Sequence, residues 1–218
     1  FQPEMHLGSG LRFNKHVPLV VGVDPGLGGS ACIFGQEDLN GRLNVLGELV
    51  QSGIGVQRLM TDKVKPYIRN RFPEADVILA PDPAAGGRSS NDERAAVDVM
   101  RKHFRQIKIE TNNRLPLRLT AIEHYSSRLT EVGPALQIDG RHCPMLVRAL
   151  KGGWRFEMDT KKDQMKSLSP EKNIYSHPGD AFGYLCRYYH RLSERAGHMP
   201  GGRVAALPVQ KMASYHFR

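Results

Sequence analysis

The spacing of apolar and polar positions predicts three strands at the start of the chain. A short apolar run at 17–23 is rich in β-branched residues and stops at a turn signal, Asp24-Pro25-Gly26. Residues 29–36 and 42–51 predict two more strands, and the Asn40-Gly41 pair between them favours a hairpin. We therefore expect an antiparallel opening to a sheet.

The period then changes to that of a helix. Apolar residues at helical spacing predict a helix from about residue 55 to 72, which Pro73 ends. The same reasoning predicts four further elements in alternation. They are a buried strand at 77–80, a helix at 92–103, a strand at 107–110 and a helix marked by Leu115, Leu119, Ile122 and Leu129.

The second half of the chain is less regular. Residues 134–168 mix strand-like and helix-like pieces and include a basic, hairpin-like insertion around 153–168. A last helix is expected to begin at Pro178, after Ser176-His177, because proline suits the first helical position. This order predicts an α/β fold of the RNase H-like class, with a mixed sheet of three antiparallel and then parallel strands between helices on both faces.

The domain limits follow from this order of elements. Residues 1–16 lack periodicity and are expected to form a flexible lead-in. The folded RNase H-like domain is expected at 17–196, and residues 197–218 are expected to form a C-terminal tail.

Of the features of the composition, only the charge indicates a class of binding partner. The formal net charge of +9 favours a polyanion, although a merely soluble basic protein would have the same charge. Basic residues occur in groups that could line a groove for phosphates. These groups are Lys63, Lys65, Arg69 and Arg71; Arg101, Lys102 and Arg105; Arg114 and Arg118; and Lys161, Lys162 and Lys166.

Membrane and disulfide-bonded classes are not favoured. No apolar run approaches the roughly 18 residues that cross a bilayer. The three cysteines lack the paired spacing of a zinc site or a disulfide framework, so we expect buried thiols in a reducing compartment.

Three aspartates stand at the ends of predicted elements. Asp24 ends the first buried strand, Asp82 follows the strand at 77–80, and Asp180 is expected in the first turn of the last helix. Because the carboxyl ends of parallel strands meet at one edge of a sheet, these acids are expected to form an oxygen-rich cluster. Such a cluster suits Mg²⁺ or Mn²⁺, and two such ions can promote phosphodiester hydrolysis.

Each aspartate also has a purely structural interpretation. The Asp-Pro pairs at 24–25 and 82–83 could form tight turns, and Asp180 could complement the helix dipole. The joint placement of all three at one sheet edge is what predicts a catalytic metal site.

The segments that hold these acids resemble the C-terminal nuclease domain of the phage terminase large subunit. The similar segments are 21–27; Asp82-Pro83-Ala84 with Arg88-Ser89 and Asp92-Glu93; Gly152-Gly153-Trp154; and 172–181. The resemblance extends from about residue 17 to 192.

The resemblance implies a metal-dependent endonuclease that cuts double-stranded, concatemeric viral DNA at the start and end of head filling. Asp24, Asp82 and Asp180 would be its catalytic residues and would bind two divalent ions, Mg²⁺ or Mn²⁺. Candidate accessory residues are Asp92, Lys172 and His177, and candidate DNA contacts are Arg88, Lys161, Lys162 and Lys166. The implied partners are the ATPase motor domain, the small terminase subunit and the portal, in the cytoplasm of the infected host and outside the mature virion.

The sequence lacks the phosphate-loop pattern G-x-x-x-x-G-K-[ST], so this chain is not expected to hydrolyse ATP as the terminase motor does.

Three alternative functions remain at this point. A Holliday-junction resolvase of the same fold usually needs a fourth acid, and none stands out. An actin-like ATPase needs two such subdomains, for which the 218 residues are short. A non-catalytic DNA-binding module would not need the aspartate trio.

Overall fold

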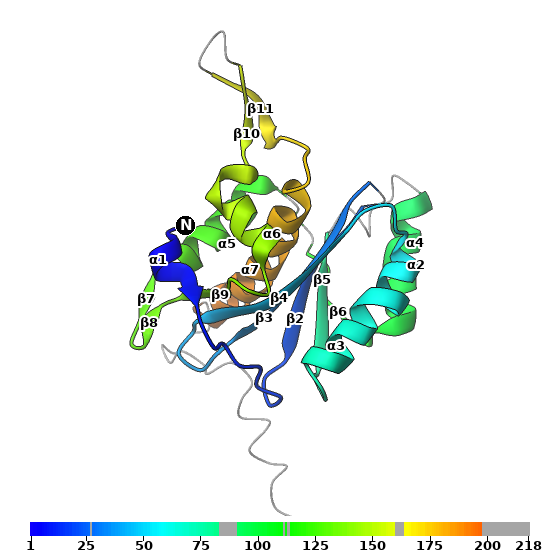
Figure 1. The fold of residues 1–218 in the computed structure, drawn as a ribbon, viewed down its shortest axis with the longest axis horizontal. Helices are drawn as coiled ribbons and strands as arrows, with labels where there is room; N and C mark the ends of the chain where they lie inside the picture. The colour runs from blue at the N-terminus through cyan, green and yellow to red at the C-terminus, as the bar shows by residue number, and fades with distance from the viewer. Residues whose placement is uncertain (27, 83–90, 111, 113, 160–163, 198–218) are drawn as a thin grey trace, which may run out of the picture.

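A seven-stranded mixed sheet forms the centre of the fold (Figure 1). The computed structural model describes residues 1–26, 28–82, 91–110, 112, 114–159 and 164–197, and describes only the backbone at 91–95, 157–159, 164–169 and 196–197. The strand order is β1-β9-β4-β3-β2-β5-β6. The strands are β1 Leu7–Gly8, β2 Leu19–Pro25, β3 Ser30–Glu37, β4 Leu43–Gln51, β5 Val77–Pro81, β6 Gln106–Ile107 and β9 Leu136–Asp139.

The five strands from β4 to β6 have the arrangement expected for an RNase H-like fold. Strand β3 is antiparallel to both β2 and β4. Strands β5 and β6 are parallel to β2. The predicted three antiparallel strands followed by parallel strands are therefore confirmed.

Helices cover both faces of the sheet (Figure 1). On one face lie α5 Leu115–Ser126, α6 Pro144–Arg148 with the π-helix Ala149–Gly153, and α7 Ser176–Gly197. On the other face lie α2 Val56–Arg58, the π-helix Leu59–Val64, α3 Lys65–Arg71 and α4 Asn91–His103.

Strand β2 is buried on both faces because its side chains alternate between two cores. Val20 packs into the core that contains Phe182 of α7. Val21 and Val23 pack into the core that contains Met60 of the other helical layer. A strand covered on both faces needs a nearly continuous apolar sequence, which is the run that predicted it.

The amino-terminal segment differs from the expectation of a lead-in without regular structure. Residues Pro3–His6 form α1, and β1 pairs in parallel with β9. The Gln36 side chain donates to the backbone carbonyls of Asn14 and Val17, at 2.8 and 2.6 Å. Neither a two-residue edge strand nor hydrogen bonds of this kind leave a periodic signal in the sequence, so the regular structure at 3–8 was not predicted.

The face of α5 was also assigned incorrectly. The helix buries Arg118, Ala121 and Tyr125, whereas Leu129 lies beyond its end and is 65% exposed. The predicted apolar face is displaced because a cation occupies one of the buried positions.

The insertion around 153–168 contains an antiparallel hairpin, as its sequence suggested. It consists of β10 Phe156–Asp159 and β11 Gln164–Pro170, and it projects away from the sheet beyond α6 (Figure 1). A second, shorter hairpin joins β7 Leu129–Thr130 to β8 Gly133–Pro134.

The cysteines agree with the expectation of buried thiols. Cys32, Cys143 and Cys186 are free and buried, as predicted. Among the described helices, none combines the length and the apolar character that a membrane span requires. The expected tail beyond residue 197 lies outside the described part of the chain.

Candidate metal and nuclease site

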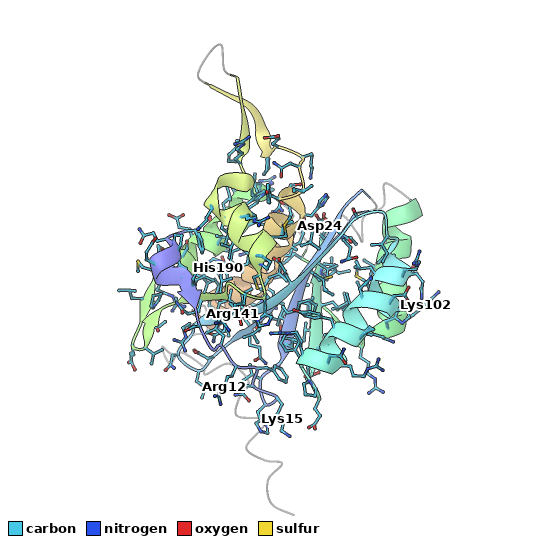
Figure 2. The ribbon with its side chains drawn as sticks, viewed as in Figure 1. Arg12, Lys15, Asp24, Lys102, Arg141 and His190 are labelled. Atoms are coloured by element: carbon cyan, nitrogen blue, oxygen red, sulfur yellow. The ribbon has the colours of Figure 1, made fainter. Side chains whose placement is uncertain are left out.

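Asp24 and Asp82 lie at the same edge of the sheet, at the ends of two adjacent parallel strands. The β2–β5 pairing ends with Val23 opposite Pro81. The Asp82 amide then donates to the Val23 carbonyl at 2.9 Å. The two aspartates follow directly, and Figure 2 shows Asp24 at the end of the sheet opposite to Lys15.

Helix α7 brings Asp180 to this edge because glycine lets it lie directly on β2. A Cβ atom on Gly22 would come within 2.0 Å of the Ala181 carbonyl oxygen, so any other residue would push the helix away. This contact places the residue before Ala181, Asp180, above the end of the strand that carries Asp24.

His177 lies one turn before Asp180 and contacts Asp24. Its Nδ1 is 2.8 Å from Asp24 Oδ2, a hydrogen-bonding distance. Gly29 gives the ring its space, since a Cβ there would lie 2.3 Å from the His177 Nε2. The glycine that follows the Asp-Pro-Gly turn therefore accommodates an internal histidine and does not simply leave space for an external ligand.

The start of α7 is built by the segment before it. The Asn173 side chain accepts hydrogen bonds from the amides of Tyr175 and Ser176, at 2.8 and 3.1 Å, and so caps the helix. The helix begins at Ser176, two residues earlier than predicted, so Asp180 lies after the first turn and not within it. Its position thus reflects the contact with β2 more than the helix dipole.

Trp154 supports the same helix start. A Cβ on Gly179 would come within 2.6 Å of the Trp154 ring, so the indole packs flat against the α7 backbone. The Gly-Gly-aromatic stretch found in the sequence thus lies next to the segment that carries Asp180.

Asp180 is held by two cations. Its side chain is 10% exposed, and its Oδ1 accepts a 2.6 Å hydrogen bond from Arg118 Nη1, whose side chain is also 10% exposed. Its Oδ2 lies 3.8 Å from Lys172 Nζ, on a side chain that is 79% exposed. Arg118 is therefore a buried partner and Lys172 a solvent-screened one.

The charges at this edge of the sheet shift the pKa of Asp180 and of its neighbour Tyr184. Burial raises the pKa of Asp180, and Asp24 raises it further, while Arg118 and Lys172 lower it. Burial also raises the pKa of Tyr184; Arg118 lowers it, and the negative charges of all three aspartates raise it further. The negative charges of Asp24, Asp82 and Asp180 thus all act on the Tyr184 hydroxyl.

The chemistry of these donors suits a hard divalent cation. Carboxylate oxygens are the ligands that Mg²⁺ and Mn²⁺ prefer, and repulsion among three acids favours a cation between them. Within the described residues, however, no three histidine, cysteine or acidic side chains are already gathered closely enough to hold a metal ion. Asp24 and Asp180 instead contact basic side chains.

The other predicted residues divide into described and undescribed ones. His177 and Lys172 both contact the aspartate cluster. Asp92 lies in the first turn of α4 and Lys166 in β11, but their side chains are outside the described part. Arg88, Lys161 and Lys162 also lie outside the described residues.

Arg118 and Tyr184 are neighbours of the candidate site that the sequence did not reveal. Arg118 was grouped with Arg114 as a surface phosphate contact, but it is 9% exposed and its guanidinium carbon lies 5.0 Å from the centre of the Tyr184 ring. Its helical spacing to Ala121 and Tyr125 was the signal that could have placed it on the buried face of α5.

Neither the protein-family models nor the curated proteins compared with this sequence give a match. Solved structures do. The large terminase of a thermophilic bacteriophage is similar with a TM-score of 0.62 and 15% identity, over 85% of this chain and 43% of that chain. The nuclease domain of the large terminase g2p from bacteriophage SPP1, solved with bound Mn, is similar with a TM-score of 0.51 and 18% identity, over 83% of this chain and 93% of that domain.

The two alignments differ in how much of the neighbour they cover. This chain spans less than half of the thermophilic phage's terminase but nearly all of the SPP1 nuclease domain. At these identities the likeness shows the fold. The chain thus has the RNase H-like fold of large terminase nuclease domains.

Proposed function

We propose that this chain is a nuclease domain that cuts double-stranded, concatemeric viral DNA during genome packaging. The observation that carries the proposal is the placement of Asp24 and Asp82 at the carboxyl ends of adjacent parallel strands, with Asp180 on the helix that packs directly on β2. The fold shared with terminase nuclease domains supports it, and so does the Mn bound in the SPP1 domain.

Asp24, Asp82 and Asp180 would hold two divalent ions, Mg²⁺ or Mn²⁺. The three acids would act together, because β5, which precedes Asp82, pairs with β2, and α7, which carries Asp180, packs on β2. When bound, such ions supply an activated water and stabilise the departing oxygen of a phosphodiester.

Side chains around the acids are proposed to orient them. His177 holds one oxygen of Asp24, and Arg118 holds one oxygen of Asp180. Partners of this kind fix the orientation of a metal-binding carboxylate. Lys172 stands at the exposed rim beside Asp180, where its ammonium group can approach a DNA phosphate.

DNA binding is proposed to be independent of sequence and strongly dependent on salt. The net charge of +9 favours contacts to phosphates, which release counterions when they form. Arg88, Lys161, Lys162 and Lys166 remain proposed contacts, and Asp92 remains a proposed accessory acid. In a complete packaging machine the motor domain, the small terminase subunit and the portal would hold the duplex at the site, in the host cytoplasm.

The test is nicking of supercoiled plasmid DNA in Mg²⁺ or Mn²⁺, comparing the wild type with Asp24→Asn. Loss of a metal-binding carboxylate should remove several kcal/mol of transition-state stabilisation, so the rate should fall on the order of 10³-fold. Asp98→Asn, on the exposed side of α4, is the matched control and should cut normally.

Two results would contradict the proposal. Cutting by Asp24→Asn at the wild-type rate would remove Asp24 from the site. A strong preference for four-way junctions over linear duplex of the same sequence would favour the resolvase class instead.

A further inference from the structure

Arg118 is the buried cation of the carboxylate cluster, and its side chain packs between α5 and α7. Its Cβ and Cδ lie 3.3 Å from the position that a Cβ on Gly183 would occupy, so the arginine stem occupies the surface left by that glycine. The guanidinium then lies between Asp180 and the ring of Tyr184. Both contacts are made from the first turn of α5 to α7, across a helix–helix interface.

The guanidinium is poorly satisfied as a hydrogen-bond donor. Its Nη1 donates to Asp180 at 2.6 Å and lies 3.5 Å from the Tyr184 hydroxyl. Its Nε is buried and has no hydrogen-bond partner in the described part of the chain. Buried donors are ordinarily paired, so an arginine kept here with an unpaired donor requires another explanation. The charge of the side chain, more than its hydrogen bonds, accounts for its position.

That charge opposes the repulsion among the aspartates. Asp24 and Asp180 lie at the same edge of the sheet, and Arg118 donates to Asp180 between two side chains that are each 10% exposed, so its positive charge acts there with little screening by solvent. Lys172 is too exposed to do so strongly, because solvent screens it. Arg118 therefore supplies the fixed positive charge where a divalent ion would otherwise supply it.

We propose that Arg118 is a built-in counter-cation that stabilises the metal-free site and competes with the divalent ions that load it. This inference rests on the proposed function. Arg118 already holds Oδ1 of Asp180, which leaves that carboxylate one oxygen for a metal, and its charge repels any second cation nearby. The site thus binds divalent ions weakly until DNA phosphates add negative charge.

The variant that separates charge from packing is Arg118→Met. Methionine keeps an unbranched stem beside Gly183 and Tyr184 but removes the charge, whereas Arg118→Lys keeps the charge without the planar fork. Arg128→Met is the matched control. Arg128 is half-buried, and like Arg118 it has an Nε without a hydrogen-bond partner among the described residues and lies near a tyrosine ring, 5.9 Å from the centre of Tyr125. Its guanidinium, however, donates to the Gly41 carbonyl.

The experiment measures Mn²⁺ binding to the chain without DNA, by calorimetry and by the signal of free Mn²⁺ in electron paramagnetic resonance, together with the melting temperature in chelator. Arg118→Met should melt at a lower temperature without metal, bind Mn²⁺ about 3–10-fold more tightly than the wild type, and gain a larger upward shift in melting temperature from Mn²⁺. Arg118→Lys should bind Mn²⁺ like the wild type, and Arg128→Met should lose stability with no change in Mn²⁺ affinity.

The outcomes separate this inference from the proposed function. Equal or weaker Mn²⁺ binding by Arg118→Met, while the wild type binds Mn²⁺ and Asp24→Asn does not, would overturn the counter-cation role and leave the metal site standing. Absence of Mn²⁺ binding in both the wild type and Arg118→Met would overturn both proposals.

Discussion

Two groups of acidic side chains with low exposure have partners that differ in kind. At the carboxyl end of β2, Asp24 and the adjacent Asp180 of α7 are held by basic side chains. Asp24 contacts His177, and Asp180 contacts Arg118 and Lys172. These are the groups proposed to form the nuclease site.

In the β3–β4 half of the sheet, half-buried glutamates are held mainly by neutral donors. Glu48 accepts hydrogen bonds from the amides of Met145 and Leu146, at 2.7 and 2.8 Å, at the start of α6. Glu37 accepts a hydrogen bond from the Tyr125 hydroxyl. Burial raises the pKa of both glutamates, and these hydrogen bonds lower it again.

The kind of partner distinguishes acids that stabilise the fold from acids that form the candidate nuclease site. A single carboxylate can be stabilised in place by amides or a hydroxyl. A cluster of carboxylates also carries mutual repulsion, which neutral donors do not remove, so it requires cations. In this fold the basic partners are a histidine, an arginine and a lysine, and we propose that divalent ions supply the remaining positive charge.

The largest expected effect is on catalysis and is confined to the first region. Asp82→Asn keeps the shape of the side chain but removes its charge, so metal-dependent cutting should fall on the order of 10³-fold. Plasmid nicking measures the rate, and circular dichroism checks that the fold is retained. A variant that folds and cuts normally would remove Asp82 from the proposed site.

The next effect is on stability and is confined to the second region. Glu48→Ala leaves two amides at the start of α6 without their acceptor, which should cost about 2–3 kcal/mol and lower the melting temperature by about 4–10 °C. The cutting rate at a temperature where the variant is folded should not change. Glu48→Gln, which keeps one acceptor oxygen, should lose less stability. A loss of cutting equal to that of Asp82→Asn would erase the distinction between the two regions.

A smaller loss of stability is expected from Tyr125→Phe. Tyr125 is 1% exposed, and removing its hydroxyl takes away the donor to Glu37 without creating a large cavity. The cost should be about 1 kcal/mol, seen as a shift in the urea midpoint with an unchanged slope. An unchanged midpoint would mean that water replaces the hydroxyl and that Glu37 does not need this partner.

The same comparison explains what the sequence could predict. Strands β2 and β5 were predicted because each is an apolar run that ends at an Asp-Pro pair, and parallel neighbours bring such ends together. That reasoning uses only local pattern and one topological rule, and it located Asp24 and Asp82 correctly at one edge of the sheet.

The partners of the acids depend on contacts that no local pattern records. Arg118 reaches Asp180 only because α5 packs against α7 at Gly183, 65 positions further along the chain. Glu48 follows an apolar run in β4 and resembles a solvent-facing acid until α6 places its first amides over it. The sequence can therefore suggest where acids gather, but the cations that balance them come from tertiary packing.

The smallest expected effect concerns two histidines that pack against each other between α5 and α7. The rings of His124 in α5 and His190 in α7 lie 4.8 Å apart, centre to centre, and burial is the main cause that lowers the pKa of each. Arg128 lowers the pKa of His124 further, and Glu194 partly offsets the effect of burial at both histidines. A histidine whose folded pKa is depressed contributes stability that is present above its unfolded pKa of about 6.5, and that stability is lost as the pH falls through the folded pKa.

The double variant His124→Gln/His190→Gln should therefore lose less stability than the wild type between pH 7.5 and 5.5. Because both rings are only half-buried, the difference in melting temperature should be on the order of 1–2 °C. Melting curves at matched ionic strength measure it, with His16→Gln at an exposed position as the control. Since these rings lie outside the carboxylate cluster, the double variant should keep the wild-type cutting rate at pH 7.5. A loss of cutting would mean that the α5–α7 interface transmits changes to Asp180 as strongly as the aspartate's direct partners do.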